Sequence, residues 1–109
     1  MARETREAHL SKQVVDYLNE LCDRGLPVFY EHRSGNGGFN YKKGIPDFYM
    51  VVKGIHVEIE LKAPKGKLST MQEKFKYRCE SKWNILYCCP RTIEEFKEFV
   101  DALIKKILW

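Results

Sequence analysis

The stretch from residue 47 to residue 61 limits most strongly what this chain can fold into. It holds two runs of strand-forming residues, 47–53 and 55–61, joined at Lys53-Gly54, a pair typical of a tight turn. Residues equally far from a hairpin turn pair with each other, and Asp47 and Glu60 both stand six residues from it. The stretch therefore predicts an antiparallel strand pair that brings these two acids side by side.

Apolar residues recur with helical spacing at both ends of the chain. From about residue 4 to residue 24 this spacing predicts an amphipathic helix, which Gly25 and Pro27 end. The residues between Thr92 and Ile107 show the same spacing and predict a C-terminal amphipathic helix. Each helix needs a partner for its apolar face, and the sheet is the available one.

Two capping boxes mark helix starts in the second half of the chain. Ser69 and Gln72 have the required spacing and predict a helix that runs to about Lys82. Thr92 and Glu95 repeat the pattern at the start of the C-terminal helix. On the helix after Ser69, the spacing places Met71, Phe75, Arg78 or Cys79, and Lys82 or Trp83 on the inner face.

Two shorter runs complete the predicted sheet. Residues 28–32 are expected to form a short strand, and residues 85–89 form a continuous apolar run that predicts a central strand covered on both faces. The element order is then αβββαβα. We therefore expect one α/β domain over residues 1–109, with a mixed β-sheet flanked by helices.

Composition excludes several classes of protein. No apolar run approaches the ~20 residues that span a bilayer, and residues 1–12 are too polar for a signal peptide. The four cysteines show neither the spacing of a zinc site nor a disulfide framework, so we expect reduced thiols. These features predict a cytoplasmic protein with no membrane partner.

The positive charge is concentrated in two segments. Residues 33–43 carry a net charge of +3 and residues 62–82 a net charge of +5, so the rest of the chain carries −4. Since both segments flank the predicted hairpin, they could line a groove for phosphates. On charge alone, two solvated surfaces are the favoured explanation.

The second strand of the hairpin alternates apolar and ionisable residues, which places His56, Glu58, Glu60 and Lys62 on one face. Alone, this alternation is typical of a half-buried strand with a wet outer face. Asp47 adds a second carboxylate beside Glu60, and close carboxylates repel unless a cation such as Mg²⁺ or Mn²⁺ joins them. Lys62 would orient or help deprotonate the attacking water. Glu58 is expected in a salt bridge or in solvent.

The motifs around these residues resemble those of the VRR-NUC family of PD-(D/E)XK nucleases, in particular its stand-alone, phage-type members. They are Gly44-Ile45-Pro46-Asp47, Glu60-Leu61-Lys62-Ala63-Pro64, Lys67-Leu68-Ser69 and Gln72. The resemblance implies a restriction-endonuclease-like fold and an Mg²⁺- or Mn²⁺-dependent nuclease. It also implies metal ligands at Asp47, Glu60 and the Leu61 carbonyl, a catalytic lysine at Lys62, and a role for Gln72 near the site. A phage-type member would act in the cytoplasm of its bacterial host.

The family pattern also implies an acid on the first helix, and Glu4, Glu7 and Glu20 compete for this position. Glu7 precedes Leu10 by three residues and therefore lies on the inward stripe of the helix. An unpaired carboxylate there would be costly unless it met a cation. We therefore select Glu7.

The resemblance implies a DNA endonuclease that selects branched substrates such as Holliday junctions or flaps, acts as a homodimer and takes no small-molecule substrate. The alternatives are a non-catalytic nucleic-acid-binding domain and a restriction-type enzyme that reads a base sequence. The predicted phosphate contacts come from the two basic segments and the glycine-rich stretch 34–39, which we expect to be flexible. They are Arg33, Asn36, Lys42, Lys43, Lys65 and Lys67.

Overall fold

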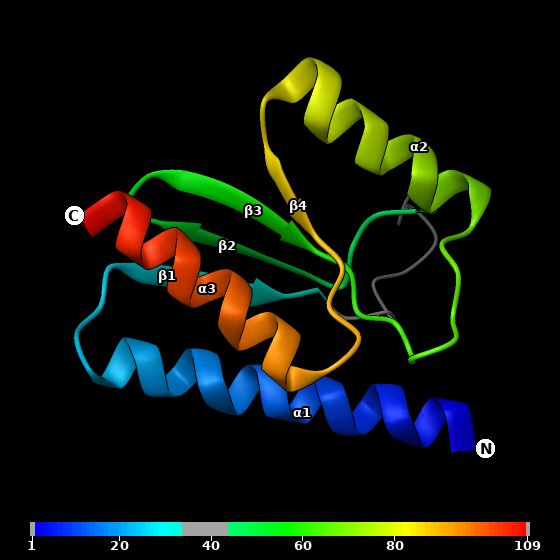
Figure 1. Cartoon of the computed structure of the whole chain (residues 1–109), viewed down its shortest axis with the longest axis horizontal. Helices are drawn as coiled ribbons and strands as arrows, with labels where there is room; N and C mark the ends of the chain where they lie inside the picture. Colours follow the sequence, from blue (N-terminus) through cyan, green and yellow to red (C-terminus); the bar gives the residue numbers. More distant parts are fainter. Residues whose placement is uncertain (1, 34–43, 109) are drawn as a thin grey trace.

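The predicted hairpin lies at the centre of the fold in a computed structural model, which describes residues 2–33 and 44–108. The predicted order αβββαβα is confirmed (Figure 1). The elements are α1 (Ala2–Asp23), β1 (Val28–His32), β2 (Phe48–Val52), β3 (Ile55–Ile59), α2 (Thr70–Arg78), a π-helical turn η1 (Cys79–Trp83), β4 (Leu86–Cys88) and α3 (Ile93–Leu108).

The turn of the hairpin has the predicted position and register. Val52 pairs with Ile55 and Phe48 pairs with Ile59. Lys53 and Gly54 both have positive φ, 48° and 88°, as the tight turn that matches strand twist requires. The register therefore follows from the turn, and it fixes which residues lie opposite each other at the far end of the hairpin.

The four strands form a mixed sheet in the order β1-β2-β3-β4. The first three strands are antiparallel neighbours, and β4 is parallel to β3. The prediction that residues 85–89 form a central strand is wrong, because β4 lies at the edge and Leu86 is 41% exposed. Cys88 is nevertheless buried against the core and the hydroxyl of Tyr87 is buried too. The continuous apolar run therefore shows that side chains on both faces of β4 are covered, but it does not show that β4 has a strand on each side.

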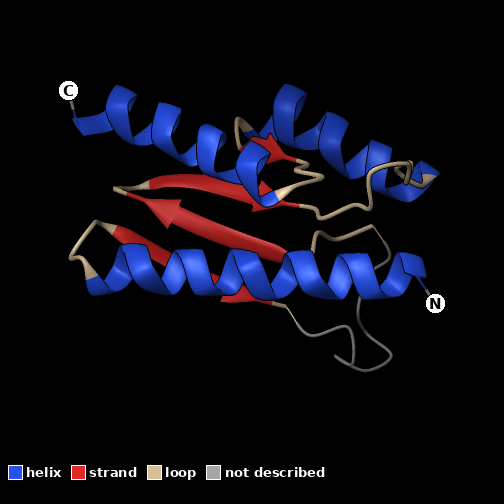
Figure 2. Cartoon of the chain, turned by 60° about the horizontal axis from the view of Figure 1, so that its bottom comes forward, coloured by secondary structure: helices blue, strands red, loops and turns tan. Residues whose placement is uncertain are grey.

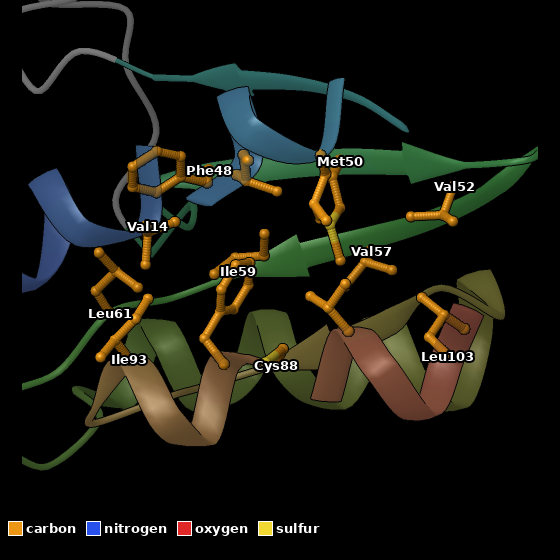
Figure 3. Packing of buried hydrophobic residues seen from close by; sticks show 14 of the residues in the cluster. Val14, Phe48, Met50, Val52, Val57, Ile59, Leu61, Cys88, Ile93 and Leu103 are labelled. Atoms are coloured by element: carbon orange, nitrogen blue, oxygen red, sulfur yellow. The ribbon is translucent and has the colours of Figure 1, made fainter. Parts of the chain in front are cut away.

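Helices α1 and α3 lie side by side over one face of the sheet (Figure 2). Their apolar stripes meet the inward residues of β2 and β3, such as Phe48 and Ile59, in one buried cluster (Figure 3). The helices contribute Leu10, Val14, Leu18, Leu21, Ile93, Phe96, Val100 and Leu103 to it. No helix among the described residues is long and apolar enough to cross a membrane. The four cysteines are free thiols, as predicted.

The other face of β3 is not wet. Glu58 is 3% exposed, and the Arg33 guanidinium donates to both of its carboxylate oxygens, at 2.6 and 3.0 Å. His56 Nε2 lies 2.6 Å from the same carboxylate. The predicted salt bridge of Glu58 is confirmed. The solvent-exposed face that the alternation alone favoured is not found, since Glu58 and Glu60 are both buried. A buried carboxylate requires such partners, because an unpaired buried charge is strongly destabilising.

Helix α2 stands apart from the sheet (Figure 1), and none of its residues is buried. The capping box of Ser69 and Gln72 is confirmed. The predicted inner face is confirmed only in part, since Cys79 is buried and Phe75 half-buried, whereas Met71 is 44% and Trp83 47% exposed. The buried contact comes from Cys79, at the start of η1.

At the start of α3, the predicted capping box forms only in part. Thr92 Oγ1 accepts from the main-chain N–H of Glu95, whose own carboxylate accepts from the N–H of Arg91.

Candidate active site

Asp47 and Glu60 come together at the open end of the hairpin. Asp47 directly precedes β2 and Glu60 directly follows β3, and one more step of the register places them opposite each other. The main-chain N–H of Leu61 donates to Asp47 Oδ2 across 3.3 Å. The segment after β3 stays beside the end of β4, because the Glu60 N–H donates to the carbonyl of Cys88 at 2.9 Å. The predicted proximity of the two acids is confirmed.

The segment that leads into Asp47 begins at Gly44, where only glycine fits. Its φ is +88°, and a Cβ built there would lie 2.6 Å from the main-chain oxygen of Met71 on α2. Pro46 is fully buried, and its carbonyl accepts from Arg33 Nη1 at 3.0 Å. The Arg33 N–H also donates to the Asp47 carbonyl at 2.7 Å. The chain before Asp47 is therefore held against both α2 and Arg33.

The carboxylate of Glu60 is buried without full compensation. Its residue is 4% exposed, and Oε1 has no hydrogen-bond partner among the described residues. Burial raises the pKa of Glu60 to about 8, and the charge of Asp47 is the next cause, while Lys62 acts in the opposite direction. Burial and the charge of Asp47 thus both oppose the ionised form of Glu60, which a bound cation would favour.

These residues fit Mg²⁺ or Mn²⁺. Among the side chains that the structure describes, no three of the His, Cys, Asp and Glu types gather as a metal cluster, so the candidate side-chain ligands are the carboxylates of Asp47 and Glu60. Mg²⁺ is commonly held by one or two carboxylates, with waters and substrate phosphate completing its shell. Asp47 and Glu60 provide that number, the orphaned Oε1 provides an acceptor, and the Leu61 carbonyl is the predicted third donor.

Of the candidate acids Glu7 and Glu20, whose side chains the structure describes, Glu7 is the one whose charge reaches the pair. It is half-buried, and it adds to the causes that raise the pKa of Glu60. Glu20 is exposed and forms an ion pair with Arg24, with 3.7 Å between the charged atoms. The side chain of Glu4 lies outside the described residues. The geometry thus favours Glu7, while its catalytic role stays a prediction.

Lys62 leaves the strand on the same end of the sheet. It is half-buried and lines a hollow of about 250 Å³ together with His9, Gln13 and Arg91. Its charge lowers the pKa of Glu60, so its ammonium group lies within electrostatic reach of the acid pair. Asp47, Glu60 and Lys62 are therefore the three predicted groups that the fold brings together.

Arg91 is a residue of the site region that the sequence analysis missed. Its Nη1 donates to the carbonyl oxygens of Ala63, at 2.9 Å, of Pro64, at 3.4 Å, and of Gly66. It thereby holds the loop that follows Lys62. The one sequence signal for Arg91 is its position directly after Pro90, the residue that was expected to end the strand.

The remaining predicted residues lie in different surroundings. Lys65 and Lys67 are exposed on the loop after Lys62, where a phosphate could reach them. Arg33 is engaged with Glu58, so its predicted phosphate contact competes with an internal partner. The carbonyl of the Gln72 side chain accepts from the Ser69 N–H at 2.8 Å, which confirms its capping role. Asn36, Lys42, Lys43 and the stretch 34–39 lie outside the described residues.

Comparison with known proteins adds one finding. No protein-family model matches the chain, and no curated protein matches it. A solved structure of a VRR_NUC domain is similar, with a TM-score of 0.66 at 15% identity, over 88% of this chain and 95% of that domain. The chain thus has the fold of a VRR_NUC domain, and the predicted restriction-endonuclease-like α/β fold is confirmed.

Proposed function

We propose that the chain is a metal-dependent nuclease of the VRR-NUC family, which hydrolyses phosphodiester bonds in DNA. The observation that carries this proposal is the pairing of Asp47 with a buried Glu60 whose Oε1 has no partner among the described residues. Lys62 lies within electrostatic reach of the pair, and the fold is that of a VRR_NUC domain. Two acids can hold a cation that polarises a phosphate, and a nearby lysine can act on the attacking water.

Each residue has a distinct task in this proposal. Asp47, Glu60 and the Leu61 carbonyl would hold Mg²⁺ or Mn²⁺, which supplies Lewis acidity and lowers the pKa of a bound water. The Lys62 ammonium group hydrogen-bonds the attacking water and orients it toward the phosphorus. Glu7 approaches the pair from α1 and adds negative charge that a cation offsets. The Leu61 N–H keeps Asp47 oriented.

Nucleic acid is the substrate class that the surface favours. Lys65 and Lys67 are exposed on the loop beside Lys62. On α2 and η1, Lys74, Arg78 and Lys82 line a hollow of about 490 Å³ beside the exposed ring of Tyr77. Cations beside an exposed aromatic ring suit a phosphate backbone with accessible bases.

Branched DNA is the preferred substrate within this class. Sequence readout needs an element that enters a groove and contacts base edges. Most of the described residues belong to the sheet and to the two helices that cover it, so we favour recognition of DNA shape over base readout. Holliday junctions and flaps present such shapes.

A panel of labelled linear, flap, forked and four-way DNA substrates tests the proposal. We expect cleavage with Mg²⁺ or Mn²⁺, none with EDTA, and faster cleavage of branched substrates. Equal binding with no cleavage under any metal would instead identify a non-catalytic DNA-binding domain. Cleavage at one base sequence in linear duplex would identify a restriction-type enzyme.

A homodimer is part of the proposal, because coordinated cuts in both strands of a junction need a pair of active sites. Strand β4 has an open edge in the described sheet, and its Leu86 is 41% exposed. Next to it lies a hollow of about 850 Å³, lined by Trp83, Leu86, Leu103 and Ile107 among others. An open edge beside an apolar hollow is a surface that a second copy can cover.

A further inference from the structure

Tyr87 has a buried hydroxyl group that the proposed mechanism does not use. It lies in the middle of β4 and pairs with Glu58 in the parallel register of β3 and β4. Within the described part of the chain, its hydroxyl oxygen is buried and has no hydrogen-bond partner. A buried polar group without a partner is costly, so its retention calls for an explanation.

The surroundings of this hydroxyl include the acid pair. Side chains alternate along a strand, so Glu58 and Glu60 share one face of β3, and Tyr87 lies on the same face of β4. Burial is the main cause that raises the pKa of Tyr87, and the charges of Glu60 and, more weakly, Asp47 act in the same direction. The Tyr87 hydroxyl therefore lies within electrostatic reach of Glu60.

The lone hydroxyl and the lone carboxylate oxygen complement each other. The Tyr87 hydroxyl can donate a hydrogen bond, and Glu60 Oε1 can accept one. Within the described residues these are the two side-chain atoms that are buried without a partner. Glu60 lies two residues beyond the register partner of Tyr87, on the same face of the adjacent strand, and a long aromatic side chain can reach such a diagonal neighbour.

We propose that Tyr87 is a positioning residue, whose hydroxyl donates a hydrogen bond to the second carboxylate oxygen of Glu60 when this carboxylate holds a divalent cation. The inference rests on the proposed metal-dependent function. Carboxylates that ligate metals are usually fixed by hydrogen bonds from neighbouring side chains, and losing such a partner weakens metal binding about 10-fold to 100-fold. Tyr87 remains a neutral donor throughout and does not contact the substrate.

Binding of Mn²⁺ alone, measured by calorimetry on the intact chain, tests this role in Tyr87→Phe. We expect the variant to bind Mn²⁺ about 10-fold or more weakly than the wild type. Without metal, its thermal unfolding midpoint should stay equal or rise, because the substitution removes a buried hydroxyl that has no partner. Cleavage should recover when Mn²⁺ is raised, because Tyr87 acts through Glu60.

Tyr30→Phe is the matched control. The Tyr30 hydroxyl donates to Asn19 Oδ1 at 2.6 Å, between β1 and α1, so its removal should lower the unfolding midpoint and leave Mn²⁺ affinity unchanged. Equal Mn²⁺ affinity in Tyr87→Phe and the wild type would overturn the role of Tyr87 alone. A wild-type chain that binds no Mn²⁺ would overturn the proposed metal site and this role with it.

Discussion

Glu60 and Asp47 lie opposite each other at the end of the β2–β3 hairpin, and the charge of Asp47 helps to raise the pKa of Glu60 to about 8. The hairpin turn, six residues away from each acid, fixes the register that places them opposite each other. An arrangement that brings acids together in a buried position opposes folding at neutral pH, so it points to a group that arrives with opposite charge.

The first prediction concerns stability against pH in the metal-free chain. The pKa of Glu60 is about 8 in the folded state against an ordinary value of 4.5. The folded chain therefore keeps a proton that the unfolded chain loses above pH 4.5, so the free energy of unfolding is highest below pH 4.5 and falls as pH rises toward 8. The loss amounts to a few kcal/mol, on the order of 1.4 per pKa unit. Urea unfolding in EDTA between pH 5 and 8.5 measures it. The free energy of unfolding of Glu60→Gln should depend less on pH than that of the wild type. Added Mn²⁺ should raise the stability of the wild type at pH 8. Parallel pH profiles of the variant and the wild type would contradict the raised pKa of Glu60.

The second prediction separates metal ligands from the lysine. Asp47→Ala and Glu60→Ala should lose Mn²⁺ binding and cleavage while keeping the fold, since each residue contributes a ligand at a strand end. Lys62→Ala should lose turnover yet still bind Mn²⁺ and DNA, because it acts on the attacking water. Calorimetry and a nicking assay on the same preparations measure both. Wild-type cleavage in any of the three would remove that residue from the mechanism.

The third prediction distinguishes structural from phosphate-binding cations. Arg33→Met leaves the buried Glu58 without its bidentate partner and should cost about 3–5 kcal/mol of unfolding free energy. The double variant Lys65→Ala, Lys67→Ala should keep its stability, since both side chains are exposed.

The same pair of lysines should matter for DNA. Their removal should weaken binding and reduce the slope of log affinity against log salt by about 1 for each phosphate that the protein no longer binds. A salt titration of DNA binding measures this slope. An unchanged slope in the double variant would argue against phosphate binding at this loop.

The fourth prediction uses two glycines with similar backbone conformations. Gly44 has φ +88° and Gly25 has φ +81°, but only the added Cβ at residue 44 would collide, at 2.6 Å from the Met71 main-chain oxygen. Gly25→Ala should therefore show strain alone, on the order of 1 kcal/mol. Gly44→Ala should cost more and also reduce Mn²⁺ affinity, because Asp47 follows three residues later. Equal effects of the two variants on metal binding would contradict the role of this close approach.

The sequence predicted local features well where one residue decides a conformation. The Lys53-Gly54 turn fixed the register, and with it the meeting of Asp47 and Glu60. The edge position of β4 and the exposure of α2 escaped prediction, because they depend on the path of the β3–β4 connection and not on local composition. Arg91 escaped for a related reason. Its acceptors are the carbonyl groups of residues 63, 64 and 66, whose nearness only the folded chain reveals.

The last prediction concerns assembly through the edge strand β4. Its Leu86 is 41% exposed and lines the apolar hollow formed with Leu103 and Ile107 of α3. A homodimer that buries this surface should have twice the 12.9 kDa chain mass in light scattering at micromolar concentration. Leu86→Arg should yield a monomer of unchanged fold, since a charge on an exposed edge opposes strand pairing at little cost to the subunit. The variant should then nick four-way junctions one strand at a time while still cutting flaps. A wild-type chain with monomer mass that nicks singly would exclude paired cleavage and leave a single-strand, flap-type nuclease.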